Sequence, residues 1–73
     1  MPQTTIPSEI NGRVFRIEVA VGAEIEEAQT LIILESMKME IPVEAPVAGR
    51  VTEILVALEA EVFEGQPLVV LES

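Results

Sequence analysis

Hydrophobic and polar residues alternate along several short stretches of the chain, as they do in half-buried β-strands. In the segment "FRIEVAV" (15–21), every second residue is large and apolar, which is the two-residue period of a strand. Denser aliphatic runs occupy "TLIILES" (30–36) and "PLVVLES" (67–73), and β-branched residues of this kind favour strands. With further extended segments at 3–7 and 39–44, the pattern predicts about eight short strands.

The chain also contains an internal repeat with an offset of 37 residues. Residues 11–36 align with residues 48–73 without a gap, and 14 of the 26 aligned positions are identical. The identical pairs include Gly12/Gly49, Arg13/Arg50, Val14/Val51, Glu35/Glu72 and Ser36/Ser73. The protein is therefore two copies of one structural unit, joined by the connector 37–47.

The repeat decides between helix and strand for residues 52–67. Taken alone, this segment is rich in helix formers and ends at Gly65 and Pro67, which is typical of a helix. Its counterpart in the first copy has strand periodicity, so strands are predicted in both copies. Each copy should then contain a strand from the Gly-Arg-Val, a loop near 20–24 or 57–61, a very short strand, a turn and a strong terminal strand.

These elements predict an all-β fold of a single domain spanning residues 1–73. Two similar four-stranded halves should pack as a flattened eight-stranded sandwich or barrel with quasi-two-fold symmetry. The expected core residues are Val14, Ile17, Val19, Ile32 and Leu34, with their second-copy counterparts Val51, Ile54, Val56, Val69 and Leu71. Pro42 indicates either an edge strand or a position that is not hydrogen-bonded, because proline cannot donate to a strand ladder.

The connector breaks the two-fold pattern and holds the only lysine, Lys38. Because Ser73 is the counterpart of Ser36, the chain ends should lie at one pole of the molecule and Lys38 at the other. If Met37 and Lys38 form a two-residue hairpin turn, both should have positive φ, at a cost of roughly 1–3 kcal/mol in strain.

Charge and composition exclude several functions. Thirteen acidic residues against four basic ones give a net charge of −9, which repels nucleic acid. The chain has no His, Cys, Asp or Tyr, so the common general bases, thiol nucleophiles and metal ligands are missing, and neither an enzyme nor a metal site is expected. The aliphatic runs are far shorter than the roughly 18 residues of a membrane span, and no secretory signal is visible. A cytoplasmic protein, monomeric in isolation, is expected.

The segment "ESMKMEIPVEAPVAGRV" (35–51) resembles the biotin attachment site of the biotinyl, or biotin carboxyl carrier, domain family. In that family a Glu stands three residues before the modified Lys, Met flanks the Lys on both sides, and Ala-Pro and Gly-x-Val follow. The matching residues are Glu35, Met37, Lys38, Met39, Ala45, Pro46, Gly49 and Val51. The resemblance covers roughly residues 4–73 and implies the family's barrel-sandwich hybrid fold, without the protruding thumb of some members.

The resemblance implies a carrier and not a catalyst. A biotin protein ligase would attach biotin to Lys38 and recognise Glu35, Met37 and Met39. The domain would then shuttle carboxybiotin from a biotin carboxylase to a carboxyltransferase acting on acetyl-CoA, another acyl-CoA or a small acceptor. Such a subunit serves acetyl-CoA carboxylase in fatty acid biosynthesis, although the missing thumb weakens the assignment to that enzyme.

Two other functions stay open. Lipoyl domains of 2-oxoacid dehydrogenase complexes share the fold but typically carry Asp-Lys-Ala at the tip, and a few small biotinyl-type proteins accept either group. A binding module with an unmodified lysine is the third possibility. Ala28 and Glu59 stand where the family often has glycine, which costs stability if φ is positive there. The chain is either a free-standing subunit, which Met1 favours, or a domain excised from a longer protein.

Overall fold

The computed structural model describes residues 2–73, which form eight short strands and no helix. The strands are β1 (Gln3–Pro7), β2 (Gly12–Ile17), β3 (Glu24–Ile25), β4 (Thr30–Ser36), β5 (Met39–Glu44), β6 (Gly49–Ile54), β7 (Glu61–Val62) and β8 (Pro67–Glu72). The described part of the chain thus offers no helical segment of the length and hydropathy needed to traverse a bilayer.

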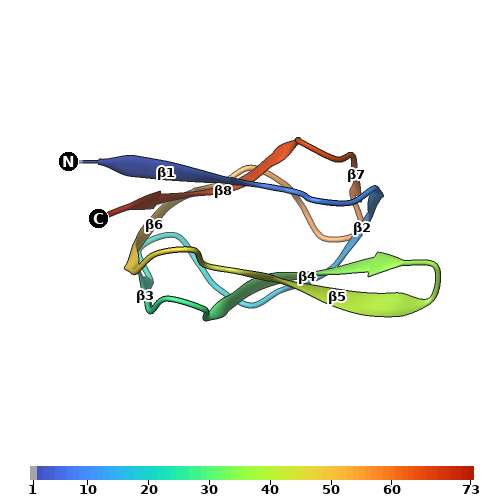
Figure 1. The fold of residues 1–73 in the computed structure, drawn as a ribbon, viewed down its shortest axis with the longest axis horizontal. Helices are drawn as coiled ribbons and strands as arrows, with labels where there is room; N and C mark the ends of the chain where they lie inside the picture. The colour runs from blue at the N-terminus through green and yellow to red at the C-terminus, as the bar shows by residue number, and fades with distance from the viewer. Residues whose placement is uncertain (1) are drawn as a thin grey trace.

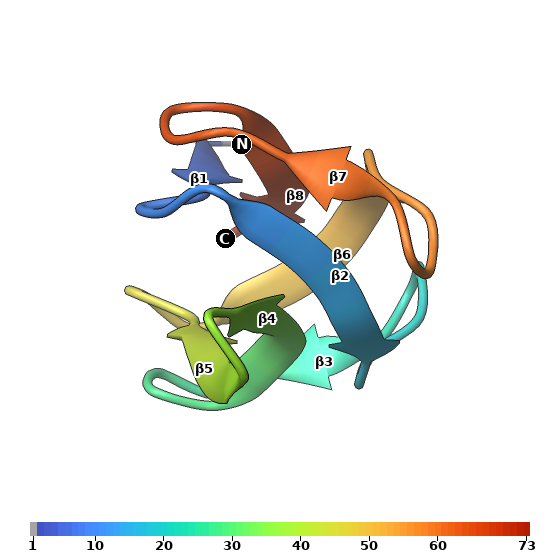
Figure 2. The ribbon, with the colours of Figure 1, turned by 90° about the vertical axis from the view of Figure 1, so that its right-hand side faces the viewer.

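The strands form two antiparallel four-stranded sheets that face each other (Figure 2). One sheet has the order β1-β8-β6-β3 and the other the order β5-β4-β2-β7. This arrangement confirms the predicted all-β class and the two four-stranded halves. β5 is an edge strand of its sheet, which is one of the two alternatives that Pro42 indicates.

The 37-residue offset relates the two sheets strand by strand. It carries β1, β2, β3 and β4 onto β5, β6, β7 and β8, and it carries one sheet order onto the other. The sheets are nevertheless not the two sequence copies, because each short strand joins the sheet of the other copy: β3 pairs with β6, and β7 pairs with β2. Each copy therefore completes the other's sheet.

The core lies between the sheets and confirms much of the predicted set. Val14, Ile32, Leu34, Val51, Val69 and Leu71 are buried, while Ile17, Val19, Ile54 and Val56 are partly buried against them. Other core residues do not belong to the predicted set, including Leu31 and Leu68, which are 0% exposed, and Ile25 and Val62 of the short strands. Simple alternation missed Leu31 and Leu68 because they are buried next to Ile32 and Val69 at the starts of β4 and β8.

The strand predicted from Gly12 to the loop near 20–24 is shorter than the alternation over 15–21 suggested. β2 ends at Ile17, and its pairing with β4 shifts register between Val14 and Arg16. Such a bulge changes which side chains face the core. Beyond the strand the chain must cross to the other sheet, where the N–H of Gly22 donates to the carbonyl of Val51 at 2.7 Å. Val21 lies on this crossing and is 63% exposed.

Candidate functional site

The hairpin of β4 and β5 forms one end of the elongated molecule, opposite the two chain ends (Figure 1). The molecule measures 36 × 18 × 18 Å along its principal axes. At the opposite pole the N–H of Ser73 donates to the carbonyl of Pro2 at 3.1 Å, so the ends lie side by side. The prediction that Lys38 and the chain ends occupy opposite poles is confirmed.

Met37 and Lys38 are the two central residues of the hairpin turn. Ser36 pairs with Met39 in the strand ladder, which leaves two residues between the strands. Their φ angles are 52° and 66°, as a two-residue turn that matches the twist of the hairpin requires. The predicted turn is confirmed, although neither residue is the glycine or asparagine that such φ values favour.

The turn presents its side chains to solvent. Lys38 is exposed, Met37 is 90% exposed and Met39 is 59% exposed. These two large apolar side chains are held in water and contribute little to the core of this chain. An amine at such a tip can reach the active site of a modifying enzyme without distortion of the sandwich.

Lys38 also differs from the other basic residues in its charge environment. Each arginine lies in an ion pair with a glutamate: Arg13 with Glu35, Arg16 with Glu18 and Arg50 with Glu72. Across residues 2–73, Lys38 is the basic side chain with no carboxylate within ion-pair distance. No local partner therefore has to be removed before its amine can react.

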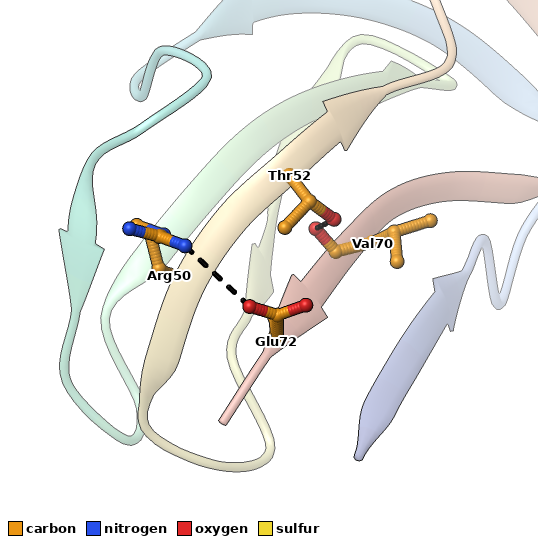
Figure 3. Close-up of polar contacts among 4 residues, drawn as sticks. All are labelled: Arg50, Thr52, Val70 and Glu72. Carbon is orange, nitrogen blue, oxygen red and sulfur yellow. Dashed lines mark hydrogen bonds and ion pairs between the residues drawn. The ribbon is translucent and has the colours of Figure 1, made fainter. Parts of the chain in front are cut away.

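Glu35 sits at the base of the tip in a contact that the second copy repeats. Its carboxylate accepts a hydrogen bond from Arg13, and Arg50 donates in the same way to Glu72 at 3.4 Å (Figure 3). The second pair lies at the pole of the chain ends, where no lysine is present. The ion pair alone therefore accounts for Glu35 as part of the fold, and recognition of Glu35 by a ligase stays a prediction.

A groove beside the tip was not anticipated from the sequence. It has a volume of about 430 Å³ and lies between β1 and β5, with Ile6, Ile10, Ile41 and Val43 among its lining residues. No sequence pattern indicated it, because it depends on how far apart the two edge strands stand. The prolines in the two strands, Pro7 and Pro42, were the available signal.

A comparison with known proteins identifies the family of this chain. The family model described as "Biotin-requiring enzyme", for biotin and lipoyl attachment, matches residues 2–71. The chain belongs to this family. The match confirms the resemblance drawn from the tip residues and supports biotin as the covalently bound cofactor.

Individual members of the family are similar over part or all of the chain. A biotin/lipoyl attachment protein of Bacillus subtilis is 44% identical over 41 residues, which is 56% of each chain. A biotinylated protein TB7.3 homolog of Mycolicibacterium smegmatis is 50% identical over 40 residues, or 55% of this chain and 56% of the relative. The alignments thus span little more than half of these relatives.

The crystal structure of the Kluyveromyces lactis urea carboxylase contains the same fold. It superposes on 99% of this chain with a TM-score of 0.93 and 32% sequence identity, and the matched part is 6% of that enzyme. In that protein the matching fold is therefore one small segment of a much larger carboxylase.

Proposed function

We propose that this protein is a biotin carrier in which a biotin protein ligase acylates Lys38, and that it moves a carboxyl group from a biotin carboxylase to a carboxyltransferase. The observation that carries the proposal is the tip itself. The single lysine of a chain from a biotin-requiring family lies in a strained two-residue turn, exposed and free of ion pairs within residues 2–73. Bound biotin would supply the nitrogen that accepts the carboxyl group.

The shape of the molecule suits a carrier. A rigid sandwich holds the attachment point at one end of its 36 Å axis, and the flexible lysine arm extends the reach of the attached group. Tethering makes the second encounter effectively intramolecular within an assembly. The contacts with each enzyme should be small and transient, since tight binding to either would stall the cycle. Met37 and Met39 would supply the apolar contacts with the ligase.

The acceptor is proposed only as a class. A carboxylase acting on acetyl-CoA, another acyl-CoA or a small acceptor such as an amide is consistent with the carboxylase neighbour, which acts on urea. A lipoyl or dual role is the second candidate, and the printed name of the Bacillus subtilis relative, a biotin/lipoyl attachment protein, favours keeping it.

The first experiment measures which group is attached, and where. The purified protein is incubated with a biotin protein ligase, ATP and biotin, and in parallel with a lipoate ligase and lipoate. Intact mass should increase by one biotinyl group, with a matching streptavidin blot. Lys38→Arg keeps the charge but removes the acylated amine, so it should gain no mass.

Three results would contradict the proposal. The absence of any mass increment with either ligase would remove the carrier function. A lipoyl increment with no biotinyl increment would replace it with the second candidate. Biotinylation of Lys38→Arg to the same extent as the native chain would place the attachment elsewhere.

A further inference from the structure

The groove between β1 and β5 separates the free edges of the two sheets. β1 is the last strand of one sheet and β5 is the last strand of the other, and the two lie on the same side of the sandwich with a space between them (Figure 2). Ile10 on one side and Ile41 and Val43 on the other are partly buried lining residues, whereas Ile6 and Leu34 line the groove but are only 5% and 1% exposed. The walls are thus mainly aliphatic.

Each of the two edge strands contains a proline. Pro7 lies in β1 and Pro42 lies in β5, and each removes a backbone donor from its strand. The sheet orders contain no pairing between β1 and β5. The groove therefore lies between two unpaired edges at the boundary between the sheets.

An apolar row of side chains connects the groove with the tip. Side chains two residues apart lie on the same face of a strand, so Met39 shares a face of β5 with Ile41 and Val43. The last two line the groove, and Met39 is the neighbour of Lys38. Three residues of strand separate Lys38 from Ile41, which is roughly 10 Å. A lysine side chain extended by an acyl chain covers that distance.

The charged groups at the groove restrict what can enter. Glu9 and Glu44 are its charged lining residues, and none of the lining residues is basic. The two carboxylates repel an anion and can accept hydrogen bonds from N–H groups, while Thr5 adds a hydroxyl to the lining. The groove therefore suits a neutral, mostly apolar group that carries N–H donors.

We propose that this groove is the resting site of the acyl group attached to Lys38. The inference rests on the proposed acylation of Lys38. The attached group folds back over Met39 and along β5, and its apolar part contacts Ile41 and Ile10 across the groove. Because the tether holds the group at a high effective concentration, a weak contact is enough for occupancy. An acyl group that has gained a negative charge is disfavoured by Glu9 and Glu44 and leaves the groove.

The experiment compares amide and methyl NMR spectra of the unmodified and the acylated protein. Lys38 is the only lysine, so a biotin N-hydroxysuccinimide ester can acylate it chemically even if no ligase accepts the protein. Lys38→Arg treated in the same way carries any label on the terminal amine alone and serves as the control. We expect shift changes at Ile6 and Ile10, which are distant from Lys38 in the sequence, and biotin-to-methyl contacts at Ile10.

Two variants make the test more specific. Each introduces at one position the residue that the other copy has at the equivalent position. Ile41→Thr introduces the residue of the equivalent position, Thr4, and should abolish the shift changes at Ile6. Leu55→Glu introduces the residue of its own equivalent position, Glu18, outside the groove lining, and should retain them. Both changes place a residue that the same fold already accepts in the other copy.

The shift changes measured in the acylated native protein decide whether the groove inference holds. Shift changes confined to residues 36–40 after verified acylation would overturn the groove inference and leave the proposed function intact. If the ligase adds nothing while chemical acylation still produces the shifts at Ile6, the groove inference holds and the proposed function fails.

Discussion

Two kinds of residues meet at the tip, and the internal repeat distinguishes them. Glu35 has a counterpart, Glu72, with the same arginine contact at the other pole. The glycine before its ladder partner Arg13 leaves no room for a side chain: a Cβ on Gly12 would lie 2.6 Å from the carbonyl oxygen of Glu35. Met37 and Lys38 instead stand where the other pole has chain ends. Features present at both poles serve the fold, and features of one pole are candidates for recognition.

This comparison gives a matched test for Glu35. Glu35→Gln and Glu72→Gln each remove one exposed ion pair, so each should lower the free energy of unfolding by at most about 1 kcal/mol. Only Glu35→Gln should lower kcat/KM for biotinylation, because Glu72 lies at the far pole. Urea denaturation and a timed ligase assay measure the two effects. Native kinetics for Glu35→Gln would restrict this residue to a role in folding.

At the scale of elements, the turn that follows each short strand forms the same backbone with different residues. Ala28 has a φ of 72° and its N–H donates to the carbonyl of Ala45, whereas Gly65 has a φ of 88° and its N–H donates to the carbonyl of Ser8. Nothing lies within 4 Å of a Cβ placed on Gly65. The difference between the two turns is therefore conformational and not steric crowding from elsewhere.

Ala28→Gly should stabilise the protein and Gly65→Ala should destabilise it. Relief of the left-handed strain of alanine outweighs the entropy that glycine adds to the unfolded chain, for a net gain of about 0.5–1 kcal/mol. The reverse change should cost about 1 kcal/mol. Urea midpoints at constant m-value report both. A lower midpoint for Ala28→Gly would show that the turn is not strained by its side chain.

The elements also show how far the sequence predicts this fold. The repeat identified the strands. It also replaced the helix that the composition of residues 52–67 alone would predict with the strand of the first copy. The exchange of β3 and β7 between the copies could not be predicted, because two-residue strands carry no pattern that selects a partner. The groove was missed for a related reason: it depends on the distance between two edges. The turn at Met37 and Lys38 was predictable because its geometry depends only on the local spacing of the strands.

At the scale of the whole molecule, the proposed attachment residue and the chain termini lie at opposite ends of the long axis. Pro2 and Ser73 are hydrogen-bonded neighbours at one end, and Lys38 is at the other. Chain termini placed together at the surface are compatible with fusion to other domains. The tip should then stay accessible whatever precedes or follows the domain.

A fusion experiment tests this separation. A folded domain joined before Pro2 or after Ser73 should leave kcat/KM for biotinylation of Lys38 unchanged. The same fusions with Lys38→Arg correct for lysines of the added domain, and peptide mapping locates the modification. A large fall in rate for either fusion would mean that the ligase contacts the pole of the chain ends.

The exchange of the short strands has a further consequence for stoichiometry. Each sheet takes two strands from the first half of the chain and two from the second, so two separate half-length chains could assemble into the same sandwich. Such an assembly would have two equivalent poles, each with a free chain start and a free chain end. Covalent fusion converts one pole, and only one, into a closed turn. The single chain thereby presents one attachment point, and two groups attached to the same chain cannot compete for its groove.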